Sequence, residues 1–344
     1  MLHKLTIKAF FFNAKTDYLP YYKNFTIKIN GSESVKRLLD AIKVENEDFS
    51  FPQKNLILKI NNLIVEGQEK IENIVSKLGT TIQIDSANNY RSNNGLIINN
   101  NDFMQSYSLL EPYATEKDLE FYTNLYALHY ASETSNFDRG YIGDAILILA
   151  DKMIKDTPTN EKVIIKAIHS GLFDCEYENN LFNAQDYTKT INYLKELAIK
   201  EPNDAPSLCD MIKSKLGIKP KEEILPKTSL KTIENLKEKQ IAFYGKNENI
   251  SKEINKLETN EITFNRASKL SGESLLIHSR ELALKKAGST LLDAYDSGAE
   301  VIVVEDNNTF NMFEDNFKCI EKVVGRKMLN LELISLESFK KQVA

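Results

Sequence analysis

The three cysteines are the residues with the most versatile chemistry in this sequence, and their spacing limits their use. Cys175, Cys209 and Cys319 lie far apart and include no C-x2-C pair. A disulfide framework needs an even set of cysteines, and a closed cysteine metal site needs four ligands. We therefore predict isolated, reduced thiols. The charges of Asp174 and Glu176 disfavour the thiolate of Cys175, so we expect inert packing there.

The four histidines do not form a catalytic or metal-binding set. They are scattered, and no H-x-x-x-H pair of ligands occurs. His129 lies in a helical pattern beside Tyr126 and Tyr130, without a nucleophile at a recognisable spacing. We predict that His129 is a packed or hydrogen-bonded helix residue. In the nearby turn FDRGY, we predict that Asp138 caps the following helix and that Gly140 allows a close turn.

A candidate ligand crevice involves Gly245, Glu305 and Asp306. Gly245 follows the strand-like IAFY and precedes a helical segment, a position where backbone amides can bind phosphate, although neither G-x-G-x-x-G nor G-x-x-x-x-G-K-S is present. Glu305 and Asp306 end the strand-like VIVV, where α/β sheets often bind ligands. An ordinary strand-to-helix turn and a solvated loop end are the simpler interpretation.

Composition sets the class of protein. A chain of 344 residues with 42% hydrophobic residues can form two or three domains with cores of their own. The 44 basic and 49 acidic residues give a net charge of -5, which offers nucleic acid no electrostatic attraction. The longest apolar run, residues 145–150, is far shorter than the roughly 20 residues of a membrane span, and the N-terminus lacks a secretory signal. We expect a cytoplasmic protein.

The hydrophobic pattern predicts an α+β multidomain chain in three parts. Alternating residues over 5–12 and 25–29 predict a hairpin, and further strands at 56–60, 63–67 and 81–85 predict a small mixed sheet of β-grasp order within a domain 1–101. Residues 102–200 carry helical spacing and predict an all-α domain.

The last part of the chain alternates strand and helix. Four prolines and the charged KPKEE make residues 201–228 a linker. Within a domain 229–344, the strand-like IAFYG, EITF, VIVVED and LELISL alternate with helical segments. This order favours a parallel sheet covered by helices.

The first two domains resemble the iron-sulfur subunit of succinate dehydrogenase and fumarate reductase. KAFFFNAKTDYLPYYKNFTIKI, VKRLLDAIK, ILKINN and TTIQID follow its N-terminal ferredoxin domain in order. YASETSNFDRGYIGDAILILADKMI and LFDCEYENNLFNAQDYTKTINYL follow its helical ferredoxin domain. The resemblance implies a β-grasp domain and a helical domain, and, in the family, cysteine-bound iron-sulfur clusters.

The cysteines that this resemblance would place are missing here. In the ferredoxin domain the cysteine-rich loop is replaced by SFPQKN, and two further ligand positions fall near Leu56 and Val65. In the helical domain one set of ligand positions falls near Phe121, Asn124, Ala127 and Ala131. The second set begins at Cys175 and continues at Leu181 and Gln185, with Asp186 at its proline position. One thiol cannot hold a cubane cluster.

The C-terminal domain resembles the cysteine-rich domain of heterodisulfide reductase, through STLLDAYDSGAEVIVVEDNNTFNMFEDNFKCIEKVVGRKMLNLELISLESF. In that family two cysteine motifs bind an iron-sulfur centre. Their positions here, 270–272 and 305–308, contain no cysteine, and Cys319 lies outside both. Fusions of the three modules occur among anaerobic-type respiratory reductases.

These patterns favour a non-catalytic, cluster-free relative of a respiratory iron-sulfur subunit, with a structural or protein-interaction role. We expect no cofactor and no metal, and a protein partner such as another oxidoreductase subunit, through which the chain would reach the inner membrane. Two alternatives stay open. The α/β domain could bind or convert a small molecule, or the chain could be an accessory subunit of a fumarate reductase-like or succinate dehydrogenase-like oxidoreductase.

Overall fold

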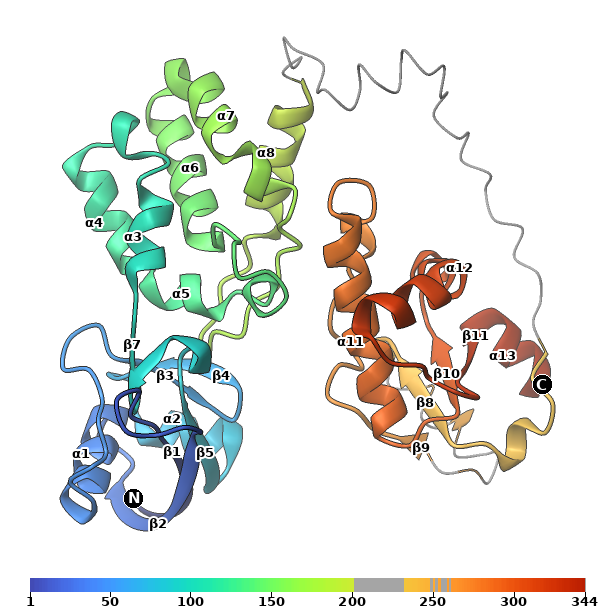
Figure 1. Cartoon of the computed structure of the whole chain (residues 1–344), viewed down its shortest axis with the longest axis horizontal. Helices are drawn as coiled ribbons and strands as arrows, with labels where there is room; N and C mark the ends of the chain where they lie inside the picture. The colour runs from blue at the N-terminus through green and yellow to red at the C-terminus, as the bar shows by residue number, and fades with distance from the viewer. Residues whose placement is uncertain (201–231, 248–249, 251–252, 255–258, 260, 344) are drawn as a thin grey trace. The chain divides into compact units, whose positions relative to one another are not determined.

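The computed structural model in Figure 1 describes residues 1–200, 232–247, 250, 253–254, 259 and 261–343. The chain divides into two compact units, Met1–Lys200 and Glu201–Ala344. The first contains a mixed sheet and the second a parallel sheet, each accompanied by helices, so the predicted α+β class is confirmed at this level. The predicted linker 201–228 and Cys209 lie outside the described residues.

The first unit begins with a five-stranded mixed sheet, which we call the sheet part. Its elements are β1 (Leu2–Phe11), β2 (Tyr21–Asn30), α1 (Val35–Glu45), β3 (Ile57–Ile60), β4 (Leu63–Glu66), α2 (Ile71–Leu78) and β5 (Thr81–Ser86). The strand order is β2-β1-β5-β3-β4, with β1 antiparallel to β2 and parallel to β5. The predicted hairpin is confirmed.

Alternation of side chains along the hairpin explains how this sheet acquires a core. Leu5, Ile7 and Ala9 of β1 are fully buried, while the residues between them face solvent. Helix α1 buries its own apolar stripe, which includes Leu38, and starts where the Ser34 side chain accepts a hydrogen bond from the Arg37 amide. Each fully buried aliphatic side chain contributes roughly 1.5–3 kcal/mol.

The rest of the first unit is helical, and we call it the helical part. Its elements are the short strands β6 (Ser92–Asn94) and β7 (Ile97–Ile98), then α3 (Asn101–Tyr107), α4 (Glu116–Asn124), α5 (Tyr126–Ala131), α6 (Asp144–Asp156), α7 (Glu161–Leu172) and α8 (Thr188–Lys200). Helix α6 is buried along most of its length and packs against α4, α5, α7 and α8.

Two helix boundaries differ from the sequence prediction. The helix predicted over 116–130 is two helices that break at Leu125. Asp138 does not cap α6, because its Oδ1 accepts the Gly140 amide hydrogen at 2.8 Å, within the preceding turn. Helix α6 starts only at Asp144, after Gly143 at a φ of 88°. The positive φ of Gly143 therefore sets the helix start, and the prediction for Asp138 was wrong.

The loop between α7 and α8 joins the helical part to the sheet part. The Ile64 amide of β4 donates to the Asn180 carbonyl at 2.7 Å, and the Phe182 amide donates to the Ile64 carbonyl at 2.8 Å. Leu181 thereby pairs with Ile64 in parallel, outside the named strands. The side chain of Phe182 lies in the core of the sheet part. Residues 180–182 thus extend the sheet by one short strand-like segment beyond β4.

The described residues of the second unit form a parallel sheet. Its elements are β8 (Ile241–Tyr244), β9 (Glu261–Ile262), α11 (Arg280–Asp296), β10 (Val301–Val304), α12 (Asn307–Val324), β11 (Glu332–Ser335) and α13 (Leu336–Val343). The order is β11-β10-β8-β9, with every pair parallel, as predicted. In the part of the chain that the structure describes, no helix combines the length and apolarity needed to cross a membrane.

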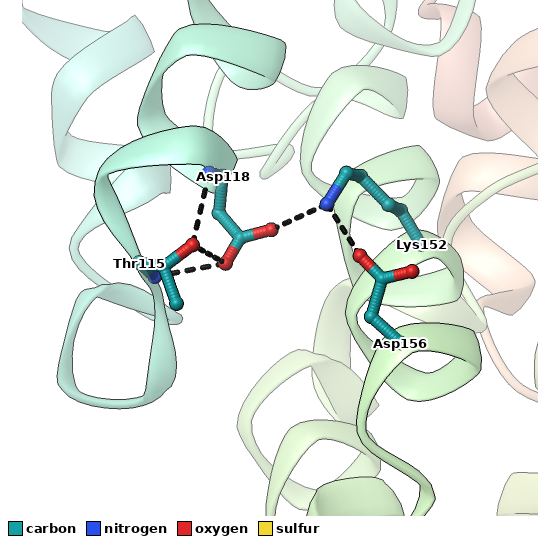
Figure 2. A network of polar contacts seen from close by, with 4 residues as sticks. All are labelled: Thr115, Asp118, Lys152 and Asp156. Carbon is teal, nitrogen blue, oxygen red and sulfur yellow. Dashed lines mark hydrogen bonds and ion pairs between the residues drawn. The ribbon is translucent and has the colours of Figure 1, made fainter.

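A polar network ties the start of α4 to α6 (Figure 2). Asp118 accepts hydrogen bonds from the amide and hydroxyl of Thr115, which completes a capping box. Lys152 of α6 donates to Asp118 at 2.8 Å and to Asp156 at 2.7 Å. Burial raises the pKa of Asp118, but the hydrogen bonds from Lys152 and Thr115 outweigh it and hold that pKa below its ordinary value.

Replacing Asp118 by Asn removes the charge that this network holds. We expect the free energy of unfolding at neutral pH to fall by about 1–2 kcal/mol. The lowered pKa means that the contribution of Asp118 is present above its ordinary pKa of 3.8 and is lost as the pH falls through the folded value. Urea unfolding from about pH 7 to about pH 3 measures this loss.

Asp156→Asn is the matched control, because Asp156 is the exposed second partner of Lys152. We expect it to change the free energy of unfolding by less than about 0.5 kcal/mol. Equal losses for the two variants would contradict the role that we give Asp118.

Candidate functional site

A cluster of buried polar side chains lies in the helical part, around the start of α6. We call it the core polar cluster and define it as Asp102, His129, Ser132, Tyr141, Asp144 and Cys175. These residues come from α3, α5, the turn before α6, α6 itself and the loop after α7. Polar groups buried in an apolar core must find partners there, so their hydrogen bonds define what the cluster can do.

Asp144 is the centre of the cluster and is completely buried. Its Oδ1 accepts hydrogen bonds from the Tyr141 hydroxyl at 2.7 Å and the Ser132 hydroxyl at 3.0 Å, and the Cys175 Sγ lies 3.7 Å away. Its Oδ2 has no partner among the described residues. Burial raises the pKa of Asp144 to about 6, and the hydrogen bonds from Tyr141 and Ser132 offset only part of that effect.

The Cys175 thiol is buried against this carboxyl group. Burial raises the pKa of Cys175 well above its ordinary value, and the charge of Asp144 raises it further. The expectation that the thiolate is disfavoured is thus confirmed. The sequence-based reason was wrong, because the carboxyl group beside the thiol belongs to Asp144 and not to the flanking Asp174 or Glu176. Cys319, on α12, is exposed.

His129 sits between Asp102 and the start of α6. Its Nε2 lies 3.4 Å from Asp102 Oδ2, and Arg91 Nε lies 3.2 Å from the same oxygen. Its Nδ1 has no partner among the described residues. A Cβ on Gly143 would lie 2.4 Å from that nitrogen, so only glycine allows the ring to approach so closely. The prediction of a packed residue is confirmed, since His129 is buried.

Asp102 responds to its surroundings in the opposite sense to Asp144. Burial raises the pKa of Asp102, but hydrogen bonds from His129 and Tyr130 and the charges around it lower the pKa below the ordinary value. The Tyr130 hydroxyl donates to Asp102 Oδ1 at 2.7 Å. Asp102 is therefore a partnered carboxylate, whereas Asp144 is a buried carboxyl group with one bare oxygen. Neither faces a second acid that could serve as its proton-transfer partner in the described residues.

The positions that the resemblance assigns to iron-sulfur ligands do not fit a cluster. Ala127 and Ala131 are buried apolar side chains, and Leu181 packs against the core of the helical part. The Gln185 carbonyl accepts from the Tyr177 hydroxyl. The remaining positions are filled in the same manner: Phe121 packs against the core, and Asp186 holds the amide and hydroxyl of Thr188.

Cys175 is the single thiol in this donor set, and one thiol cannot hold a cluster of several irons. Among the described residues, no three His, Cys, Asp or Glu side chains converge as metal ligands. Leu56 and Val65, at the ferredoxin-like positions, lie in the core of the sheet part. The chemistry of the side chains therefore argues against a cluster at each of these positions.

The structure brings two of the three candidate crevice residues of the second unit together. Glu305 Oε2 accepts the Lys246 amide hydrogen at 2.6 Å, and a Cβ on Gly245 would lie 2.4 Å from that same oxygen. Asp306 faces the other way along the chain and caps α12, accepting the Thr309 amide hydrogen at 2.8 Å. Both carboxylates thus bind backbone amides, which favours a turn and a cap.

Sequence reasoning missed Ser132, Tyr141 and Asp144 as members of one cluster. Each is unremarkable in its local pattern, and they meet only because the turn before α6 folds back on α5. One signal was present in the sequence: Asp144 directly precedes the apolar run 145–150, which buries its first turn. An acidic residue joined to such a run can be expected to need a partner inside the core.

The pKa of Asp144 gives a testable pH dependence. Because folding raises the pKa from 3.8 to about 6, Asp144 stabilises the fold fully below the lower value and loses this effect as the pH rises through the upper one. Asp144→Asn cannot ionise. We expect its free energy of unfolding to gain about 2–3 kcal/mol relative to wild type between about pH 4 and about pH 8, measured by urea unfolding.

Asp102→Asn is the control of opposite sign. Its lowered pKa predicts that this variant loses stability relative to wild type as the pH rises through the ordinary value of 3.8. Parallel pH profiles for the two variants would refute the assignment of opposite environments to Asp102 and Asp144.

Comparison with known proteins gives no family. The chain matches no family model and no curated protein. A crystal structure of a hypothetical protein from Helicobacter pylori is similar over 98% of this chain and 70% of that chain, with 18% sequence identity and a TM-score of 0.48. A similarity at this level carries no conclusion about fold or function, so the assignment of function depends on the residues described above.

Proposed function

We propose that this chain is a non-catalytic, cluster-free relative of a respiratory iron-sulfur subunit and acts as a structural or protein-interaction component. The strand order β2-β1-β5-β3-β4, with α1 following the first hairpin, supports a β-grasp domain of ferredoxin type. A helical part follows it directly, as in the family that the sequence resembles. The parallel sheet of the second unit is compatible with a domain like the cysteine-rich domain of heterodisulfide reductase.

The donor set around Cys175 is the observation that carries this proposal. A cluster needs thiolates, and the pKa of this thiol is raised by burial and by Asp144. Binding iron through Cys175 would place a thiolate beside a buried carboxyl group, with no other thiol of the described residues nearby. Such an arrangement favours a neutral, packed thiol, and electron transfer through this region loses its physical basis.

A scaffold of this kind can keep its fold without metal because apolar burial supplies the folding energy. In metal-dependent small domains the metal-ligand bonds provide much of that energy. Here Leu56, Val65 and Leu181 occupy ligand positions with apolar side chains, and α6 buries its whole run 145–150. A chain that has exchanged ligands for core residues retains surfaces, and surfaces are what a structural or interaction component uses.

The alternative of a ligand-binding or enzymatic α/β domain has less support. Glu305 and Asp306 each bind a backbone amide, and a ligand in the crevice would have to displace those hydrogen bonds. We expect the partner to be a protein, with another oxidoreductase subunit as the first candidate.

The proposal predicts that the chain does not assemble a cluster. We expect iron and acid-labile sulfide far below stoichiometric amounts in protein purified without oxygen, before and after incubation with ferrous iron and sulfide. The absorption spectrum should lack a visible charge-transfer band. Stoichiometric iron and sulfide, with a visible spectrum that Cys175→Ala abolishes, would refute the proposal. Cys319→Ala is the control, because that thiol is exposed on α12.

A further inference from the structure

The sheet of the first unit treats its two edges differently. The edge at β4 is paired by residues 180–182 of the same chain. The other edge is β2, and within the described residues β2 pairs only with β1. An unpaired edge strand presents a row of backbone donors and acceptors, which another extended chain can bind. The ten residues of β2 make this edge long.

The register of the hairpin identifies the open backbone groups. The Gly31 amide donates to the Met1 carbonyl at 2.8 Å, so these two residues form a hydrogen-bonded antiparallel pair. Hydrogen-bonded and non-bonded pairs alternate along such a ladder, so the odd-numbered residues of β2 bond to β1. The amides and carbonyls of Asn24, Thr26 and Lys28 consequently point away from β1, to the open edge.

A groove runs beside this edge, between β2 and α1, with a volume of about 530 Å³. Its β2 wall consists of residues 26–30, and its α1 wall includes Ala41 and Val44. Ile27 and Ile29 are buried beneath it, whereas the Val44 side chain is 85% exposed. The groove therefore offers an apolar strip alongside the open hydrogen-bonding groups, which is the combination that an added strand needs.

The outer face of the hairpin carries an unbalanced positive charge. Lys4 of β1 and Lys28 of β2 are directly opposite each other in the register. Both are exposed, and neither has an ion-pair partner within the described residues. Like charges at directly opposed positions repel, so an acidic side chain placed next to Lys28 would relieve the pair. A strand added to β2 places every second side chain on that face.

We infer that the groove between β2 and α1 binds an extended segment of a partner protein, which adds to β2 as a sixth strand. The segment carries apolar side chains at alternate positions, facing Ala41 and Val44, and acidic side chains between them, facing Lys4 and Lys28. This inference deepens the proposed function and depends on it, because it names the surface through which an interaction component would act. A second copy of this chain fits poorly, since its own β2 would bring further lysines to the same face.

Binding can be measured with two synthetic probes on the full chain. One is a fluorescein-labelled ten-residue peptide of alternating valine and glutamate, and the other has lysine in place of glutamate. We expect the acidic peptide to bind at least about tenfold more tightly than the basic one, measured by fluorescence anisotropy at low salt. Hydrogen-deuterium exchange should slow at the amides of Thr26 and Lys28, which are open in the free chain.

Two variants separate backbone pairing from charge. Thr26→Pro removes one outward amide hydrogen without touching the ladder to β1, a position where edge strands tolerate proline, and should weaken binding of the acidic peptide at least about tenfold. Lys28→Glu keeps the backbone and should reverse the preference between the two peptides. Lys43→Glu is the matched control, because Lys43 lies exposed on α1 outside the groove lining and should change affinity less than about twofold.

Several results would overturn the inference. They are equal binding of the two peptides, binding that Thr26→Pro does not weaken while the variant keeps its thermal stability, and protection that appears away from β2. A dimer of the chain that Thr26→Pro dissociates would overturn it too, since β2 would then be an interface between copies. The proposed function has a separate test: it fails on stoichiometric iron and sulfide, whatever the peptides do.

Discussion

Two backbone hydrogen bonds to Ile64 are the interaction on which the first unit depends. They join β4 to residues 180–182, and so connect the sheet part to the loop between α7 and α8. The same loop starts close to Cys175 and delivers Phe182 into the core of the sheet part. Ile64 itself belongs to the core of the helical part. The sheet and the helices of residues 1–200 therefore share their packing, and the sheet edge at β4 receives a partner from within the chain.

The core polar cluster shows what that shared packing demands of charged groups. Asp102 and Asp144 are the same residue type in one helical core, yet their pKa values move in opposite directions. The difference lies in their partners: Asp102 has His129, Tyr130 and Arg91 around it, while Asp144 has hydroxyl groups on one oxygen and, among the described residues, nothing on the other. A buried carboxyl group without a cationic partner is most stable in its protonated form. The cluster organises packing at a cost in stability near neutral pH.

Periodicity was sufficient for the fold at the level of elements. The alternating strands of β1 and β2, the stripe of α1 and the strand-helix alternation of the second unit were all predicted, because each pattern is local. The break at Leu125 was missed, since no glycine or proline marks it. The same limit applies to the site. Cys175 was singled out, but the carboxyl group that controls it is 31 residues away in the chain, where no local rule could find it.

Single strand-like pairings are the hardest feature to read from a sequence, and they decide what each sheet edge does. Residues 180–182 have no alternating pattern, and their pairing with Ile64 depends on where the helices place the loop. The β2 edge has the opposite character: its strand is long and regular, so its alternation was predicted, but its openness is a property of the assembled sheet. Since lysines on an edge oppose pairing between identical copies, Lys28 can serve two purposes at once. It keeps the chain from pairing with itself and selects an acidic strand from elsewhere.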